Sequence, residues 1–187
     1  MLELNFKPFP ILETERLILR KITDDDAASF FEMRSNPEVM KFIPRPLANS
    51  VDDCLELITI MNDKIENNID INWTIRLKTS DTMIGHIGFF RTQPENYRTE
   101  VGYILHPNFH GLGFATEALQ AALKYGFESL QFNSIEAIID PRNTASEKVL
   151  LNNNFVKEGH FLENGFFNGE FLDSAVYSIL KRNFTIF

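Results

Sequence analysis

The sequence has a single cysteine and no long apolar run. Cys54 therefore cannot form an internal disulfide, and its place in a predicted amphipathic helix favours a small buried side chain over a nucleophile. No apolar stretch approaches the roughly 18 residues of a membrane-spanning helix, and the N-terminus lacks the basic start and apolar core of a secretory signal. We therefore expect a cytoplasmic protein that does not enter a membrane.

The sequence also lacks a cluster of basic residues. Its 18 Lys and Arg stand against 26 Asp and Glu, which gives a formal net charge of −8. This balance disfavours direct binding to nucleic acid, whose phosphates attract clustered positive charge. An acidic surface attracts a cationic amine more readily than an anion, although a solvated acidic face is the simpler explanation of the charge.

No Pro/Gly/Ser-rich linker, low-complexity tract or internal repeat divides the chain. The contents of 44% hydrophobic and 24% charged residues are those of a globular domain, and the 18 Phe predict a core rich in aromatic rings. We therefore predict one domain over residues 1–187.

Hydrophobic spacing and turn residues predict the order of strands and helices. Thr23 and Ser50 stand where helix N-caps are expected, and Asp53 follows Ser50 at the spacing of a capping box. The order predicts an α/β (α+β) fold in which helices cover both faces of a mixed sheet. Strands are expected at residues 15–22, 71–77, 83–91, 98–105, 135–140, 155–162 and 170–180, helices at 24–34, 50–67, 115–128 and 144–153, and irregular sequence at 36–49 and 92–97.

A glycine turn between strand 98–105 and helix 115–128 is the first candidate for a binding site. Gly111 and Gly113 lack Cβ atoms, so the main chain there can curl tightly and direct several N–H groups at one anion. The start of the following helix adds unpaired donors and the positive end of its dipole. Such a turn suits a pyrophosphate, with an ordinary tight turn as the alternative. Neither a three-glycine dinucleotide motif nor the Gly-Lys-Ser/Thr of a P-loop is present.

The sequence resembles the GNAT superfamily of acyl-CoA N-acyltransferases, and within it the ribosomal-protein N-terminal acetyltransferases, or RimJ/RimL-like proteins. The family's cofactor motif, Gln/Arg-x-x-Gly-x-Gly/Ala, is met at Gly113 and Ala115, while His110 replaces its first residue. The matching segments follow the family's order over about residues 13–180. They are ETERLILR (13–20), IGHIG (84–88), TEVGY (99–103), GFATEA (113–118), Asn143-x-x-Ser146 and NFVKEG (154–159).

The resemblance implies a fold and a set of cofactor contacts. The fold is a mixed, mostly antiparallel sheet that splits between central strands to take the pantetheine arm of acetyl-CoA. Asn143 would hydrogen-bond the coenzyme, and it also stands where a helix N-cap is expected. Asn154 replaces a usual Gly, and Asn is well able to adopt a left-handed conformation after a helix. Backbone groups of Tyr103, Ile104 and Leu105 would pair with pantetheine, and amides of Gly111, Leu112, Gly113, Phe114, Ala115 and Thr116 would hold the pyrophosphate.

Acetyl transfer needs a neutral amine, a place for the negative charge of the tetrahedral intermediate, and a proton for the departing thiolate. We predict Glu100 as the base, acting through water, because it is in phase with strand positions that should face the cleft; an exposed strand carboxylate is the alternative. Ser146 aligns with a serine proposed to help protonate the thiolate in the RimJ/RimL-like branch; a polar first-turn residue is the alternative. Leu150 occupies the place of the tyrosine acid of many relatives, which leaves Tyr177 as a weaker candidate acid.

We therefore predict an acetyl-CoA-dependent N-acetyltransferase that acts on a primary amine, namely a protein N-terminal α-amine. A polyamine or amino-sugar acetyltransferase and a non-catalytic acyl-CoA-binding module are the alternatives. The acceptor surface is expected from residues 24–70 and 92–97. No Ser-His-Asp or Cys-His arrangement is present, which favours direct transfer over an acyl-enzyme. No metal is predicted, because paired metal-ligand spacing is missing among the histidines, which are His86, His106, His110 and His160.

Overall fold

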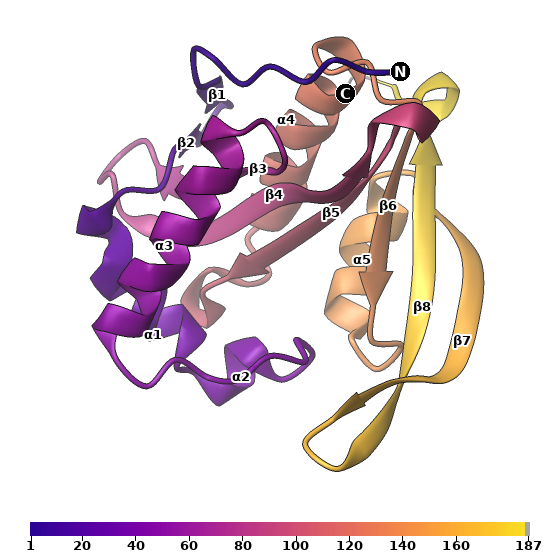
Figure 1. Ribbon diagram of the computed structural model, residues 1–187. Helices are drawn as coiled ribbons and strands as arrows, with labels where there is room; N and C mark the ends of the chain where they lie inside the picture. The colour runs from indigo at the N-terminus through magenta and orange to yellow at the C-terminus, as the bar shows by residue number, and fades with distance from the viewer. Residues whose placement is uncertain (186–187) are drawn as a thin grey trace.

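The computed structural model describes residues 1–185 and contains one open sheet with helices on both of its faces (Figure 1). The strands are β1 (Leu12–Glu13), β2 (Leu17–Arg20), β3 (Ile71–Leu77), β4 (Met83–Gln93), β5 (Arg98–Leu105), β6 (Ser134–Ile139), β7 (Val156–Phe167) and β8 (Glu170–Leu180). The helices are α1 (Ala27–Arg34), α2 (Pro37–Met40), α3 (Val51–Glu66), α4 (Phe114–Glu128) and α5 (Thr144–Asn152).

The sheet is mostly antiparallel, as the sequence resemblance implies. Its eight strands lie in the order β1-β2-β3-β4-β5-β6-β8-β7, and β5 and β6 form its parallel pair in the described chain. A parallel pair needs a crossover connection, and α4 supplies it between β5 and β6.

The sheet splits between β5 and β6. The two strands pair only at their beginnings, where Arg98, Thr99 and Glu100 lie beside Ser134, Ile135 and Glu136. Beyond Glu100 the strands separate, as Figure 1 shows, while β5 keeps its pairing with β4 on its other side. The resulting fork agrees with the split that the sequence resemblance implies. Within residues 1–185, it leaves the edge of β5 that follows Glu100 without a strand partner.

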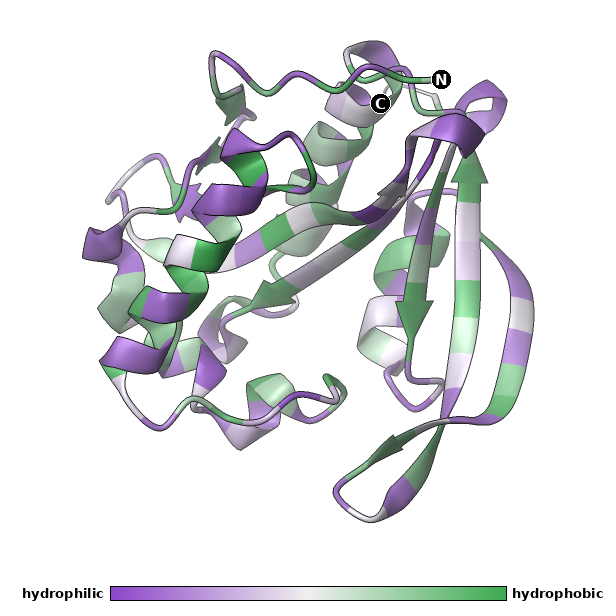
Figure 2. Ribbon diagram, in the orientation of Figure 1, coloured by the Kyte–Doolittle hydropathy of each residue, from purple (hydrophilic) through white to green (hydrophobic). Residues whose placement is uncertain are grey.

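The helices divide between the two faces of the sheet, because side chains of a strand alternate between faces. Helices α1 and α3 pack on the face that carries His86, whose ring lies 5.9 Å from that of Phe30. Helices α4 and α5 pack on the opposite face, where Trp73, Phe89 and Phe127 belong to one buried cluster. Apolar residues recur along the strands and α4 (Figure 2).

Several boundaries differ from the sequence-based predictions. Strand 15–22 is shorter, and β1 precedes it. Strand β4 continues into the predicted loop 92–97, whose remainder contains a 3-10 turn at Pro94–Asn96. Strand β7 continues five residues past its predicted end, because β8 pairs along it as far as Phe167.

The interpretation of Asn36-Pro37 as a helix end alone was incomplete. Helix α1 does end there, but Asn36 also caps α2, accepting a hydrogen bond from the Glu38 amide at 2.9 Å. Proline stands at the first helical position of α2, where its missing N–H costs nothing. An irregular segment was therefore the wrong prediction for Pro37–Met40.

The start of α3 confirms the predicted cap. The Ser50 hydroxyl accepts a hydrogen bond from the Asp53 amide at 3.2 Å. The Asp53 carboxylate in turn accepts a hydrogen bond from the Asn49 amide, not from the Ser50 amide that a capping box would use.

We expect Ser50→Ala to lower the free energy of unfolding by about 1 kcal/mol, or the Tm by about 2–4 °C for a chain of this size. Thermal unfolding measures this. Ser80→Ala, in an exposed turn, is the matched control, and an equal effect of both variants would contradict the capping role.

Within residues 1–185, no helix is both long enough and apolar enough to cross a membrane.

Candidate active site

The predicted pyrophosphate turn lies between the end of β5 and the start of α4. Gly111 and Gly113 have φ angles of +74° and +83°, a left-handed backbone that suits residues without Cβ. A Cβ built on Gly111 meets no atom within 4 Å, so the space beside Gly111 is open. Within residues 1–185, no acceptor takes the amide N–H of any residue from 111 to 116. A row of free donors at a helix N-terminus fits an anion with several oxygens.

His110, the residue that departs from the family motif, has a structural contact. Its Nε2 lies 2.9 Å from the carbonyl oxygen of Leu105. Because a carbonyl oxygen can only accept, Nε2 carries the proton in this contact. His110 thus ties the turn to the last residue of β5.

The fork between β5 and β6 lies next to this turn. Tyr103, Ile104 and Leu105 pair with β4 on one side, and their other backbone edge has no strand partner in the described chain. An elongated ligand with amide groups could use such an edge as a neighbouring strand would. The predicted pantetheine-binding residues therefore border the fork, and they lead directly toward the glycine turn.

The N-terminus of α5 brings two predicted residues close to β5. The Asn143 side chain caps the helix by accepting the Ser146 amide at 3.1 Å. The Ser146 hydroxyl lies 2.9 Å from the Tyr103 hydroxyl. Burial raises the pKa of Tyr103 to about 12, so its phenol remains protonated near neutral pH.

Asn143 retains a free donor. Its Oδ1 is used by the cap, while its amide Nδ2 has no partner within residues 1–185. Asn143 therefore serves as the predicted N-cap and can still donate a hydrogen bond to a ligand.

Glu100 lies at the point where β5 and β6 separate. It pairs in register with Phe90 of β4, whose ring is 6.4 Å from that of His86, so Glu100 lies on the face covered by α1 and α3. Its side chain is only 13% exposed and contacts the Arg91 guanidinium at 2.6 Å. Burial raises the pKa of Glu100, and the nearby Glu136 adds to this, while Arg91 opposes it.

Glu100 and Ser146 lie on opposite faces of the sheet. Residue parity along β5 places Glu100 on the α1 and α3 face and Tyr103, with its partner Ser146, on the other. No hydrogen bond joins Glu100 to Ser146 in the described part of the chain. The fork is where groups from the two faces can approach one ligand.

The weaker candidate acid, Tyr177, is 1% exposed, and its hydroxyl donates to the Glu147 carboxylate. Burial and this carboxylate raise its pKa to about 12. Leu150, at the position of the family's tyrosine acid, is fully buried. Neither residue therefore offers an accessible proton.

Buried His86 was not assigned a role from the sequence. Its Nε2 lies 3.2 Å from Asn72 Oδ1, and burial lowers its pKa to about 4, so the ring is neutral. Across residues 1–185, no group of three His, Cys, Asp or Glu side chains is arranged to hold a metal ion.

Two residues that contact the site were not assigned a role from the sequence. Arg91 pairs with Glu100 across a register shift in β4, and Arg16 contacts the glycine turn from the far end of the chain. The alternation of side chains along a strand predicts which face of the sheet a residue lies on. It does not predict the contacts of a residue in a bulge, where the register shifts.

Comparison with known proteins agrees with the family resemblance of the sequence. The family model of the acetyltransferase (GNAT) domain matches residues 16–156. An N-acetyltransferase of unassigned role from Bacillus subtilis, YoaA, is 36% identical over 173 residues, which cover 92% of this chain and 98% of the relative. The crystal structure of a GNAT-family acetyltransferase from Bacillus anthracis superposes with a TM-score of 0.83 at 29% identity, covering 92% of this chain and 99% of that one.

Two further relatives have names that state an acceptor. A spermidine N(1)-acetyltransferase from Vibrio cholerae is 24% identical over 90% of this chain and 95% of its own length. A ribosomal-protein-serine acetyltransferase from Escherichia coli is 32% identical over 52% of this chain and 55% of its own length.

Proposed function

This chain belongs to the GNAT family of acetyltransferases and is an acetyl-CoA-dependent N-acetyltransferase, and on that premise we propose that its acceptor is a protein N-terminal α-amine. The observation that carries the proposal is Glu100, a carboxylate of raised pKa at the fork of the sheet. The similarity to a ribosomal-protein-serine acetyltransferase supports it. One domain would carry the activity, because the strands of the described chain join one sheet.

The proposed cofactor contacts follow the geometry of the fork and the turn. Acetyl-CoA supplies the acetyl thioester. The free edge of Tyr103, Ile104 and Leu105 would pair with its pantetheine amides, and the Asn143 amide would donate to it. The pyrophosphate would accept from the unpaired amides of Gly111, Leu112, Gly113, Phe114, Ala115 and Thr116.

The proposed acceptor, an α-amine, is the type of amine that a single glutamate can deprotonate at the lower free-energy cost. Deprotonating an α-amine with a pKa near 8 costs about 1.4 kcal/mol at pH 7, whereas a lysine with a pKa near 10.4 costs about 4.6 kcal/mol. Glu100 is held in place by Arg91 and its pKa is raised, so it can take the amine proton through a water molecule. For a correctly positioned α-amine, one carboxylate that acts through water is a sufficient base.

The thiolate leaves on the other face of the sheet. Ser146 would donate the proton to it while accepting one from the Tyr103 hydroxyl, 2.9 Å away, and a solvent water molecule would return a proton to Tyr103, whose pKa is raised to about 12. Entry of the amine from the face of α1 and α3 and departure of the thiolate toward α5 would keep the two proton transfers apart.

A small-molecule polyamine is the second candidate acceptor. The net charge of −8 favours a polycation, and the relative from Vibrio cholerae is a spermidine acetyltransferase.

A screen of acceptors separates the two candidates. Thiol release from acetyl-CoA is measured with peptides that carry a free N-terminus, with the same peptides N-terminally blocked, and with spermidine and spermine. The proposal expects turnover that is confined to free N-termini. The proposal would be overturned if the chain acetylated spermidine or spermine but none of the peptides.

Asn143 provides a test of the cofactor contacts. Asn143→Ala removes the cap and the amide donor, so we expect a loss of about 1 kcal/mol in stability and a 3- to 10-fold weaker binding of CoA. Asn143→Ser is the matched variant, because the serine hydroxyl can cap the helix but is too short to replace the amide as a donor to CoA. This variant should keep the wild-type Tm and lose affinity for CoA. Calorimetric titration with CoA would contradict the contact if Asn143→Ser bound as tightly as the wild type.

A further inference from the structure

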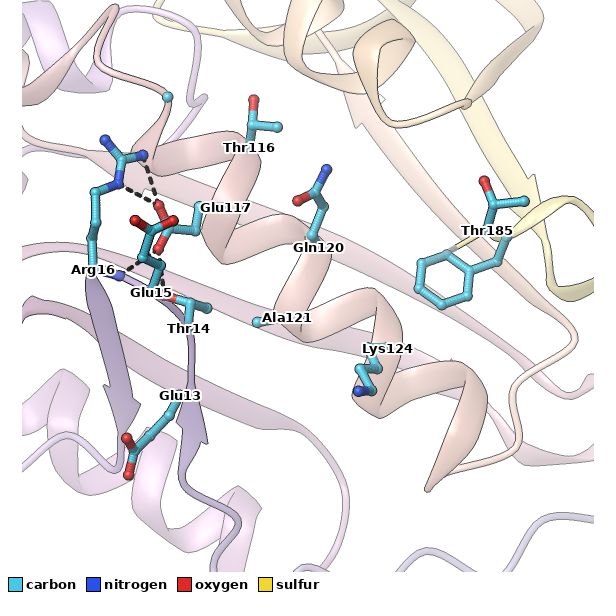
Figure 3. Close-up of a pocket in the computed structure, with 12 residues that line it drawn as sticks. Glu13, Thr14, Glu15, Arg16, Thr116, Glu117, Gln120, Ala121, Lys124 and Thr185 are labelled. Carbon is cyan, nitrogen blue, oxygen red and sulfur yellow. Dashed lines mark hydrogen bonds and ion pairs between the residues drawn. The ribbon is translucent and has the colours of Figure 1, made fainter. Parts of the chain in front are cut away.

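Arg16, in the turn between β1 and β2, contacts the glycine turn at several points. Its Nη1 donates to the Leu112 carbonyl oxygen at 3.0 Å, and its guanidinium lies 4.3 Å from the centre of the Phe114 ring. Its Nε and Nη2 each lie 2.7 Å from the Glu117 carboxylate (Figure 3). One side chain thus contacts the middle of the turn, the first residue of α4 and the first turn of that helix.

Glu117 is fixed from several sides as well. Its Oε1 accepts the Arg16 amide at 2.8 Å and the Thr14 hydroxyl at 2.5 Å. Its side chain is 16% exposed, so these contacts hold it against the protein. A carboxylate without a partner in the first turn of α4 would repel the phosphates of a ligand bound beside it. Arg16 cancels that charge.

The contact with Leu112 also orients a donor. In a trans peptide the C=O and the following N–H point in opposite directions. Because Arg16 holds the Leu112 carbonyl oxygen on its own side, the Gly113 N–H points away from Arg16 and stays free to donate to a ligand. A Cβ on Gly113 would lie only 3.3 Å from Arg16 Nη2, so the absence of a side chain lets the arginine approach this closely.

We propose that Arg16 is a positioning residue for the binding of acetyl-CoA. It sets the direction of the Gly113 amide and neutralises Glu117, and it acts through the turn without touching the thioester or the amine. The inference rests on the proposed role of residues 111–116 in holding the pyrophosphate.

Direct binding tests this role without requiring a known acceptor. CoA, 3′-dephospho-CoA and pantetheine are titrated into the purified chain by calorimetry. For Arg16→Ala we expect about 10-fold weaker binding of CoA and of 3′-dephospho-CoA, because both contain the pyrophosphate, and unchanged binding of pantetheine, which lacks it. Arg16→Lys keeps the charge beside Glu117 but cannot also hold the Leu112 carbonyl, so an intermediate loss is expected.

Lys124→Ala is the control. Lys124 and Arg16 both line a surface groove along α4, Lys124 lies two turns after Glu117, and its substitution removes the same charge as Arg16→Ala does (Figure 3). It should bind all three ligands as the wild type does. The Tm of each variant is measured in parallel, and Arg16→Lys keeps the test valid if Arg16→Ala folds poorly.

Three results would overturn the inference. The first is wild-type affinity for CoA in folded Arg16→Ala. The second is a loss of affinity for pantetheine in this variant that equals its loss for CoA. The third is a loss of affinity for CoA without a loss for 3′-dephospho-CoA, which would make Arg16 a ligand of the 3′-phosphate. If the wild-type chain itself bound no CoA, the proposed role of the turn would fail first, so the two failures can be told apart.

Discussion

Replacement of Glu100 by Gln is expected to lower kcat for acetyl transfer by about 10²- to 10⁴-fold, the range that a general base contributes. The substitution keeps the size and the hydrogen bonds of the side chain but removes its ability to accept a proton. CoA binding should be unchanged, because Glu100 is not among the proposed cofactor contacts and lies on the face of the sheet opposite Ser146. Steady-state kinetics with the acceptor found by the screen, together with CoA titration, measures both.

The pH dependence gives this prediction a second readout. The pKa of Glu100 is raised by burial, so its carboxylate becomes protonated at a higher pH than an ordinary glutamate does. Activity should therefore fall as the pH drops through the raised pKa, and Glu100→Gln should lack this acidic limb. Glu136→Gln removes a neighbouring charge that adds to the shift, so its acidic limb should move to lower pH while kcat at high pH is kept. An unchanged kcat in Glu100→Gln would show that another group is the base.

Gly111→Asp is expected to weaken CoA binding by about 100-fold at low salt. The open side of the turn has room for a side chain at Gly111, and Asp tolerates its φ of +74° better than most residues, so the fold should survive. A carboxylate about 5 Å from a phosphate charge costs about 3 kcal/mol at an effective dielectric constant near 20, and a tenfold change corresponds to about 1.4 kcal/mol.

Two controls isolate the charge in this prediction. Gly111→Asn has nearly the same shape and the same backbone preference, so it should lose much less affinity than Gly111→Asp. Gly169→Asp places the same charge at a φ of +85° with open space around it, in the turn between β7 and β8, and should bind CoA as the wild type does. Equal affinities of the Asp and Asn variants at position 111 would exclude a phosphate beside the turn.

Local signals in the sequence predicted most of the elements that position the site. The cap at Ser50 and the left-handed Asn154, with a φ of +62°, depend on residues close in sequence. Helix α2 was missed although its signal is present, because Asn36-Pro37 is both a helix stop and the start of a new helix.

Contacts across long sequence distances could not be predicted. Arg16 and Glu117 are 101 residues apart, and nothing in the spacing of either indicates the other. The point where β5 leaves β6 has no local signal either, since Val101 and the residues after it are as strand-like as those before. The motifs therefore lead to a proposed ligand for the turn, whereas the partners of Arg16 and Glu117 required the structure.

Backbone amide resonances of the turn test the central claim most directly. In the ¹⁵N-labelled chain, addition of CoA should shift the amide signals of Gly111, Gly113 and Thr116, and pantetheine alone should leave them unmoved while shifting those of Tyr103 and Ile104. If CoA bound and moved other signals while the amides of residues 111–116 stayed in place, the turn would not be the pyrophosphate site.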